Sequence, residues 1–140
     1  MTGVGAASID KKPAMEEDDD VVIQPKDCPP DSQLLGRSTW TLLHTMAANY
    51  PEKATFAEQA EMGSFLNIFS KVYPCWYCAD DFRSWLNKPE NKPKLGGKEE
   101  FSLWLCGAHN QVNNKLGKPQ FKCVDWRSRW LDGWSDGRCD

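Results

Sequence analysis

Apolar side chains recur every three or four residues from residue 34 onward, which indicates amphipathic α-helices. Local signals mark their ends: Thr55 with Glu58 reads as a capping box, Pro74 suits a first helical turn, and Gly117 suits a C-terminal cap. No stretch of the sequence alternates as a strand would. We therefore predict an all-α fold, a four-helix bundle with a short fifth helix. The helices are expected from Ser38 to Asn49, Thr55 to Val72, Pro74 to Leu86, Glu99 to Leu116 and Asp125 to Leu131.

Each of the four long predicted helices carries an apolar stripe that we expect to face a shared core. Seven tryptophans and six phenylalanines supply large groups for that core, and they also suit the pocket of a flat aromatic ligand. The stripes consist of Trp40, Leu43 and Ala47; of Met62, Phe65, Leu66, Phe69 and Val72; of Trp76, Ala79, Phe82 and Leu86; and of Phe101, Leu105, Val112 and Leu116.

The acidic excess of the chain lies at its N-terminal end. The formal net charge is −3, and residues 1–27 contain the run EEDDD with few large apolar side chains, which predicts a disordered tail. Residues 28–140 form the predicted folded domain. The sequence has no strongly basic region of the kind that indicates nucleic-acid binding. It also has no apolar run long enough for a membrane span. The N-terminus resembles neither a secretory signal nor an arginine-rich transit peptide, so entry into an organelle would need another route.

Six cysteines are unusual in a sequence that shows no secretory signal. An even number permits three disulfides, but the spacing alone does not decide their pairing. Proteins without such a signal usually keep their thiols reduced, bind metal through them or use them in redox catalysis. The cysteine content therefore favours redox chemistry or a metal site.

Cys75 and Cys78 lie three residues apart at the predicted start of the third helix. The positive end of the helix dipole stabilises a thiolate there, and such a pair exchanges readily with other dithiols. We expect the first sulfur to be the more exposed one. A zinc site, completed by Cys106 and His109, and an inert structural disulfide are the alternatives. Ala79 replaces the histidine that haem attachment needs, and the lack of strands argues against a thioredoxin.

The segment CGAHNQVNNKLGK places Cys106, His109, Asn110 and Asn113 on one side of the fourth helix. Several hydrogen-bonding side chains followed by lysines favour contact with an adenine or a phosphate. A lone histidine would instead be typical of a core residue.

Cys106 and Cys123 enclose a loop between the fourth and fifth helices. A disulfide there would stabilise the fold by about 3 kcal/mol, and a structural role is the favoured interpretation. Trp126 and Trp130, one helical turn apart, fit core packing or a ligand pocket equally well.

Four sequence blocks together resemble one protein family. LGRSTWTLLH, YPCWYC, CGAHNQVNNKLGKP and a closing C-x-x-x-x-x-RWLDGW occur in this order, and they are similar to the Erv/ALR family of FAD-linked sulfhydryl oxidases. The resemblance covers residues 28–140. The ends CPPD and DGRCD are similar to those of the animal augmenter proteins of this family, in their short form. The resemblance implies a four-helix bundle with a short fifth helix, one FAD per subunit and a homodimer.

The resemblance also implies roles for individual residues. Cys75 and Cys78 would form the redox disulfide beside the flavin, with Cys75 attacked by the substrate thiolate and Cys78 next to the flavin. Cys106 and Cys123 would form a structural disulfide, while Cys28 and Cys139 would bridge the two subunits. The implied FAD contacts are Gly36, Arg37, Ser38, Trp40, His44, Tyr73, Cys106, His109, Asn110, Val112, Asn113, Lys115, Lys118, Arg129 and Trp130.

A member of this family would oxidise protein dithiols to disulfides and pass the electrons to oxygen, forming hydrogen peroxide, or to cytochrome c. The implied compartment is the mitochondrial intermembrane space, with the cytosol as a second location, and the import oxidoreductase of that space is an implied substrate. Long forms carry a second CxxC in an N-terminal arm, whereas residues 1–27 contain no cysteine. We therefore expect a short form, or a member whose substrate contacts Cys75 directly. The competing hypotheses are a binding or signalling protein with structural disulfides, and a zinc module.

Overall fold

The computed structural model describes residues 27–140, and this part of the chain contains no strand. Three short helical segments accompany four α-helices, so the predicted all-α bundle with a short C-terminal helical segment is confirmed. The predicted disordered tail, residues 1–27, lies outside the described residues except for Asp27. The elements are α1 (Ser32–Ala48), α2 (Phe56–Val72), α3 (Trp76–Leu86), η2 (Pro89–Asn91), α4 (Lys98–Lys115), η3 (Cys123–Asp125) and η4 (Ser128–Asp132).

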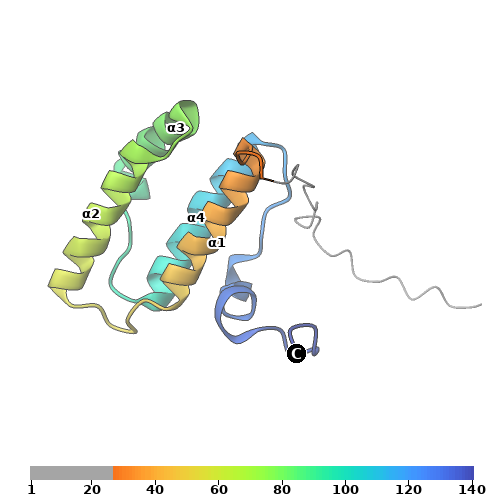
Figure 1. The fold of residues 1–140 in the computed structure, drawn as a ribbon. Helices are drawn as coiled ribbons and strands as arrows, with labels where there is room; N and C mark the ends of the chain where they lie inside the picture. The colour runs from red at the N-terminus through yellow and green to blue at the C-terminus, as the bar shows by residue number, and fades with distance from the viewer. Residues whose placement is uncertain (1–26) are drawn as a thin grey trace, which may run out of the picture.

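The long helices are arranged as two pairs. Figure 1 shows α2 beside α3 and α1 beside α4. The C-terminal turns extend the second pair, because η4 packs on α1 and η3 packs on α4. Residues far apart in the sequence, from α1, α4 and η4, are thereby brought to one region of the molecule.

The N-terminus of α1 differs from the prediction of a helix starting at Ser38. α1 begins at Ser32, because the Asp31 carboxylate accepts a hydrogen bond from the N–H of Leu34 at 2.8 Å. This bond satisfies a donor that the first helical turn leaves unpaired. The N-cap hydrogen bond of Asp31, directly after the Pro-Pro pair, therefore sets the start of α1 although its first turns are largely polar.

The start of α3 differs in the opposite direction, because the sequence predicts it at Pro74, before the observed start. The N–H of Cys75 instead donates to the carbonyl of Tyr73 at 2.9 Å, which closes a tight turn around Pro74. Cys75 is the N-cap residue in an extended conformation, and α3 begins at Trp76. By contrast, the predicted capping box at the start of α2 is confirmed, with both reciprocal hydrogen bonds between Thr55 and Glu58 present.

The core lies where α1, α2 and α4 meet, and aromatic side chains of α2 and α3 pack against it. The centres of the predicted stripes are confirmed as buried or partly buried positions. The ends are not: Val72, Trp76 and Leu116 are 68%, 80% and 64% exposed. Each of these residues lies at a terminus of its helix, where the bundle stops. The buried core residues are Leu43, Ala47, Tyr50, Ala54, Leu66, Phe101, Trp104 and Leu105.

The predicted fifth helix from Asp125 to Leu131 is less regular than a single α-helix. A 3₁₀ turn at Cys123–Asp125 leads into a π-helical turn at Ser128–Asp132. Gly133, with a φ of 79°, ends this segment in a conformation that favours glycine. Within residues 27–140, no helix combines the length and hydropathy that crossing a membrane requires.

Candidate active site

Cys75 and Cys78 form a disulfide at the N-terminus of α3, as their spacing predicts. The N-cap position of Cys75 places its sulfur near the unpaired N–H groups of the first turn, which favour a thiolate. Both residues are half-buried, and the expected difference in exposure between the two sulfurs stays a prediction. The two sulfurs are bonded to each other in residues that are partly exposed to solvent, which suits thiol–disulfide exchange.

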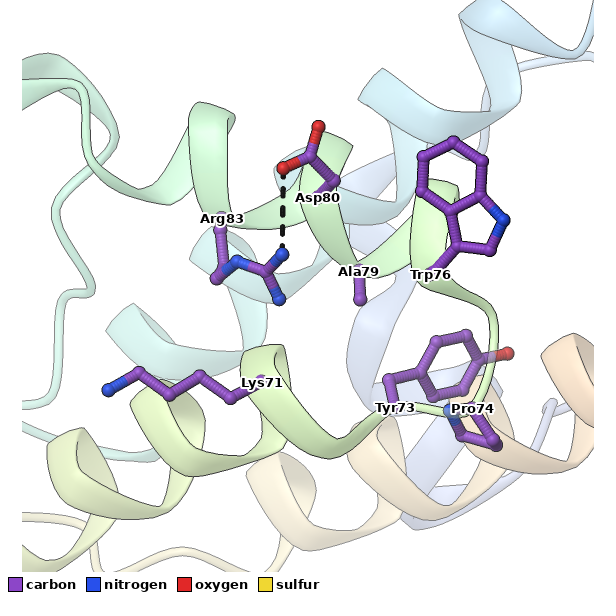
Figure 2. A pocket seen from close by; sticks show the side chains of 7 residues that line it. All are labelled: Lys71, Tyr73, Pro74, Trp76, Ala79, Asp80 and Arg83. Carbon is purple, nitrogen blue, oxygen red and sulfur yellow. Dashed lines mark hydrogen bonds and ion pairs between the residues drawn. The ribbon is translucent and has the colours of Figure 1, made fainter.

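An open pocket of about 500 Å³ lies at the N-terminal end of α3. Figure 2 shows Trp76, Tyr73 and Pro74 on one side of the pocket and the basic chains of Lys71 and Arg83 on the other. Ala79 and Asp80 complete the lining. Pro74 and Trp76, the two chain neighbours of Cys75, both line this pocket.

A second cluster consists of stacked rings from α1, α4 and η4. The rings of Trp40 and His109 stack at 4.1 Å between centroids, and those of His44 and Trp130 stack at 4.4 Å. A hydrogen bond of 2.9 Å joins Nε2 of His44 to Nδ1 of His109, and the Arg129 guanidinium lies 3.8 Å from the centre of the Trp130 ring. These five residues, the ring cluster, were all predicted to bind a cofactor, and the fold brings them together.

The buried position of His44 keeps its imidazole neutral. Burial, followed by the charges of His109 and Arg129, lowers the pKa of His44 from 6.5 to about 3. A neutral imidazole has one N–H donor and one acceptor nitrogen, so one histidine of the pair donates to the other. The ring cluster is therefore held by stacking and a directed hydrogen bond near neutral pH.

This pKa makes the folded state acid-sensitive. Between pH 6.5 and 3 the unfolded chain binds a proton at His44 that the folded chain does not bind, so stability falls as the pH falls. We expect the free energy of unfolding of the flavin-free protein to drop by about 2 kcal/mol between pH 6.5 and 5 through this group. Urea unfolding at several pH values measures the slope. His44→Gln should flatten it, and equal slopes for the two proteins would contradict the account.

The disulfide between Cys106 and Cys123 is confirmed, and it ties α4 to η3. Asn110 strengthens the same link: its Nδ2 donates to the carbonyl of Phe121 at 3.0 Å, and its Oδ1 accepts from the N–H of Phe121 at 2.9 Å. The side chain of Asn110 thus holds the loop that leads to the ring cluster. The bonded Cys106 offers no thiolate for the alternative zinc site with His109.

The remaining predicted cofactor contacts lie on α1, along α4 and after its end, and beside the redox pair. Gly36, Arg37 and Ser38 lie on α1 before Trp40, and Val112 and Asn113 follow His109 along α4. Asn113 joins Asn110 and the backbone of Lys118 by hydrogen bonds. Lys115 instead pairs with Asp81 of α3 at 3.4 Å, and Tyr73 lines the pocket beside the redox pair.

Cys28 and Cys139 are exposed and unbonded within the chain. Their predicted role as a bridge between subunits stays a prediction.

Sequence reasoning missed Lys71 and Arg83. They precede and follow the CxxC by about one turn of helix and line its pocket. The sequence signal is a basic residue on each side of the redox pair. Each of the two is next to a residue of an apolar stripe, Val72 or Phe82, and the apolar periodicity predicts a helix face without indicating a basic site.

The chain is similar to known proteins of one family. The model of the Erv1 / Alr family matches residues 37–131. The chain belongs to the Erv1/Alr family. Its resemblance to that family is thereby confirmed. The matched span contains both the disulfide of α3 and the whole ring cluster.

Two fungal members of the family are close relatives. The mitochondrial FAD-linked sulfhydryl oxidase ERV1 of Saccharomyces cerevisiae is 52% identical over 108 residues, which is 77% of this chain and 56% of that protein. The protein of the same name from Schizosaccharomyces pombe is 52% identical over 100 residues, 71% of this chain and 55% of that one. The chain thus spans about half the length of the curated relatives it matches.

Solved structures agree with the fold. The crystal structure of the yeast Erv1 core superposes with a TM-score of 0.76 at 50% identity, covering 81% of this chain and 95% of the other. The crystal structure of the FAD-binding domain of Erv1 from Saccharomyces cerevisiae gives 0.72 at 50% identity, covering 76% of this chain and all of the other. The helical bundle is therefore that of the family.

Proposed function

We propose that this chain is an FAD-linked sulfhydryl oxidase whose redox centre is the Cys75–Cys78 disulfide. The observation that carries the proposal is this bonded pair at the N-terminus of α3, in a chain that belongs to the Erv1/Alr family. The names of the yeast and fission yeast relatives support the same activity.

The first steps use only the chain's own sulfurs. A substrate thiolate attacks Sγ of Cys75, forming a mixed disulfide, while the bond between Cys75 and Cys78 breaks and Cys78 leaves as a thiolate. The second substrate thiolate then attacks the substrate sulfur and releases Cys75. The substrate has become a disulfide, its two protons have passed to solvent or to the cysteines, and two electrons remain on Cys75 and Cys78. The pocket lined by Pro74 and Trp76, on either side of Cys75 in the chain, supports this cysteine as the one attacked.

The residues of the ring cluster fit FAD by their chemistry. The aromatic side chains of Trp40, His44, His109 and Trp130 are of the kind that packs against the flat rings of the cofactor, and Arg129 brings a positive charge that suits its phosphates. Lys118, exposed after the end of α4, adds a further cation, whereas Lys115 pairs with Asp81. When bound, FAD supplies a two-electron acceptor for the reduced cysteine pair. The task of the protein is to position this acceptor and the disulfide relative to each other.

The wider physiology follows from the family. The electrons would pass on to oxygen, forming hydrogen peroxide, or to cytochrome c, and the substrates would be protein dithiols, among them the import oxidoreductase of the intermembrane space. The chain would act as a homodimer bridged by Cys28 and Cys139, in the mitochondrial intermembrane space and also in the cytosol. The mitochondrial names of the two fungal relatives support a mitochondrial location.

A thiol-loss assay tests the activity itself. We expect the purified protein to be yellow and to consume dithiothreitol thiols in air with one oxygen taken up per disulfide formed. A colourless protein with no thiol consumption after incubation with FAD would favour a binding protein with structural disulfides. Stoichiometric zinc in a metal analysis would favour the zinc module instead.

Truncating one ring of the cluster should weaken FAD binding. Trp130→Ala removes a stacking face and the ring beneath Arg129, and we expect the dissociation constant of FAD to rise about tenfold. Titration of the flavin-free protein followed by fluorescence measures it. Trp134→Ala, outside the ring cluster, serves as the control. Equal affinities for the two variants would contradict this placement of the cofactor.

A further inference from the structure

The surface around the redox pair is unusually apolar for an exposed region. Trp76 and Tyr77, the two residues enclosed by the CxxC, are 80% and 56% exposed, and Val72 is 68% exposed. Contiguous exposed apolar side chains of this size mark interaction sites more often than chance. Val72 is the last residue of α2, and Trp76 and Tyr77 are the first two residues of α3, directly after Cys75 in the chain.

The adjoining pocket combines this apolar side with a basic one. Tyr73, Pro74 and Trp76 form the first side, and Lys71 and Arg83 form the second, with the small side chain of Ala79 between them (Figure 2). Because Ala79 is small and buried, the centre of the pocket is left open to an incoming side chain.

The charges of the pocket are unbalanced. Arg83 donates to the backbone carbonyl of Ser70 at 2.6 Å and pairs with Asp80 at 3.5 Å, so its position is fixed and its charge is partly compensated. Lys71 has no carboxylate partner among residues 27–140. The lining therefore carries one uncompensated positive charge next to the apolar wall.

We propose that this pocket selects protein dithiols that carry an acidic side chain close to the reacting cysteine and an apolar side chain beside it. The acidic group would pair with Lys71, and the apolar group would pack on Trp76. The inference rests on the proposed function, because it concerns the substrate of the same disulfide. Lys71 and Trp76 act here as specificity-determining residues and take no part in the exchange of electrons.

The charge preference is measurable without any turnover of the flavin. Two reduced dithiol peptides are compared that differ at one position beside the first cysteine, glutamate in one and lysine in the other. Under anaerobic conditions, the rate at which each reduces the Cys75–Cys78 disulfide is followed by thiol alkylation and mass spectrometry. We expect the glutamate peptide to react about threefold faster, the size of one exposed charge interaction, and the difference to shrink as salt is added.

Variants separate the two halves of the proposal. Lys71→Glu should reverse the preference, whereas Lys53→Glu, a matched reversal at an exposed lysine between α1 and α2, should retain it. Trp76→Ala should slow both peptides by a similar factor. Equal rates for the two peptides, or an equal loss of preference in Lys71→Glu and Lys53→Glu, would overturn the charge selection. Unchanged rates in Trp76→Ala would overturn the apolar half.

Dithiothreitol, which has no side chains to select, distinguishes this inference from the proposed function. It should reduce the Cys75–Cys78 disulfide equally fast in the unaltered protein, in Lys71→Glu and in Lys53→Glu. Failure of dithiothreitol oxidation in air would defeat the oxidase itself. Normal dithiothreitol oxidation without peptide selection would defeat only the docking pocket.

Discussion

Cys78→Ser should abolish the oxidation of dithiothreitol while leaving the fold and the bound flavin in place. Without the second sulfur, Cys75 carries no bond that a substrate thiolate can break with a thiolate leaving group, so exchange cannot begin. We expect the rate to fall by at least about three orders of magnitude, the scale seen when a reacting group is removed. Oxygen uptake with dithiothreitol measures the loss.

The matched control for this variant is Cys139→Ser. Cys139 is exposed and unbonded within the chain, so its replacement removes a cysteine and leaves the redox pair intact. We expect turnover with dithiothreitol to stay within about twofold of the unaltered protein. Normal turnover by Cys78→Ser, or an equal loss in both variants, would contradict the assignment of the redox centre.

Removing the disulfide between Cys106 and Cys123 should cost the protein about 3 kcal/mol of folding stability, because the bond closes a loop with a sequence separation of 17 residues. The double variant Cys106→Ala/Cys123→Ala avoids leaving a lone thiol. Urea unfolding of the flavin-free protein measures the difference. An unchanged midpoint would show that the hydrogen bonds of Asn110 to Phe121 hold this junction without the disulfide.

The comparison variant is Cys75→Ala/Cys78→Ala. Its sulfurs are separated by only three residues, so the loss of entropy in the unfolded chain is smaller and we expect a cost of roughly 2 kcal/mol. The order of the two costs, rather than their exact size, tests whether the bond that closes the longer loop is the more stabilising one.

Local signals in the sequence were sufficient for the existence of the helices. The capping box of Thr55 with Glu58 predicts the start of α2, and Gly117 predicts the end of α4. Both are signals within a few residues of the chain, and both predicted the correct element. The start of α1 depends on a single hydrogen bond that the Asp31 carboxylate accepts from the N–H of Leu34, and the spacing of apolar residues does not reveal this bond. Periodicity identifies the buried face of a helix, but it does not show where the neighbouring helix ends, which is why Val72 and Leu116 were wrongly placed in the core.

No local sequence pattern predicts the ring cluster. His44 and His109 are 65 residues apart and meet through a single hydrogen bond, and no spacing rule joins α1 to η4. Family resemblance named these residues together, and the fold supplies the physical reason, since η4 packs on α1 beside α4. The reverse holds for Lys71 and Arg83, which no family block marked and which only the shape of the pocket brings into view.

The central claim is that a substrate dithiol reduces Cys75–Cys78 and that this pair in turn reduces the bound flavin. Anaerobic addition of dithiothreitol to the FAD-loaded protein, followed by absorbance at about 450 nm, tests it most directly. We predict that the flavin band bleaches in the unaltered protein and persists in Cys78→Ser. Bleaching at the same rate in both proteins, or a protein that binds no flavin, would contradict the account.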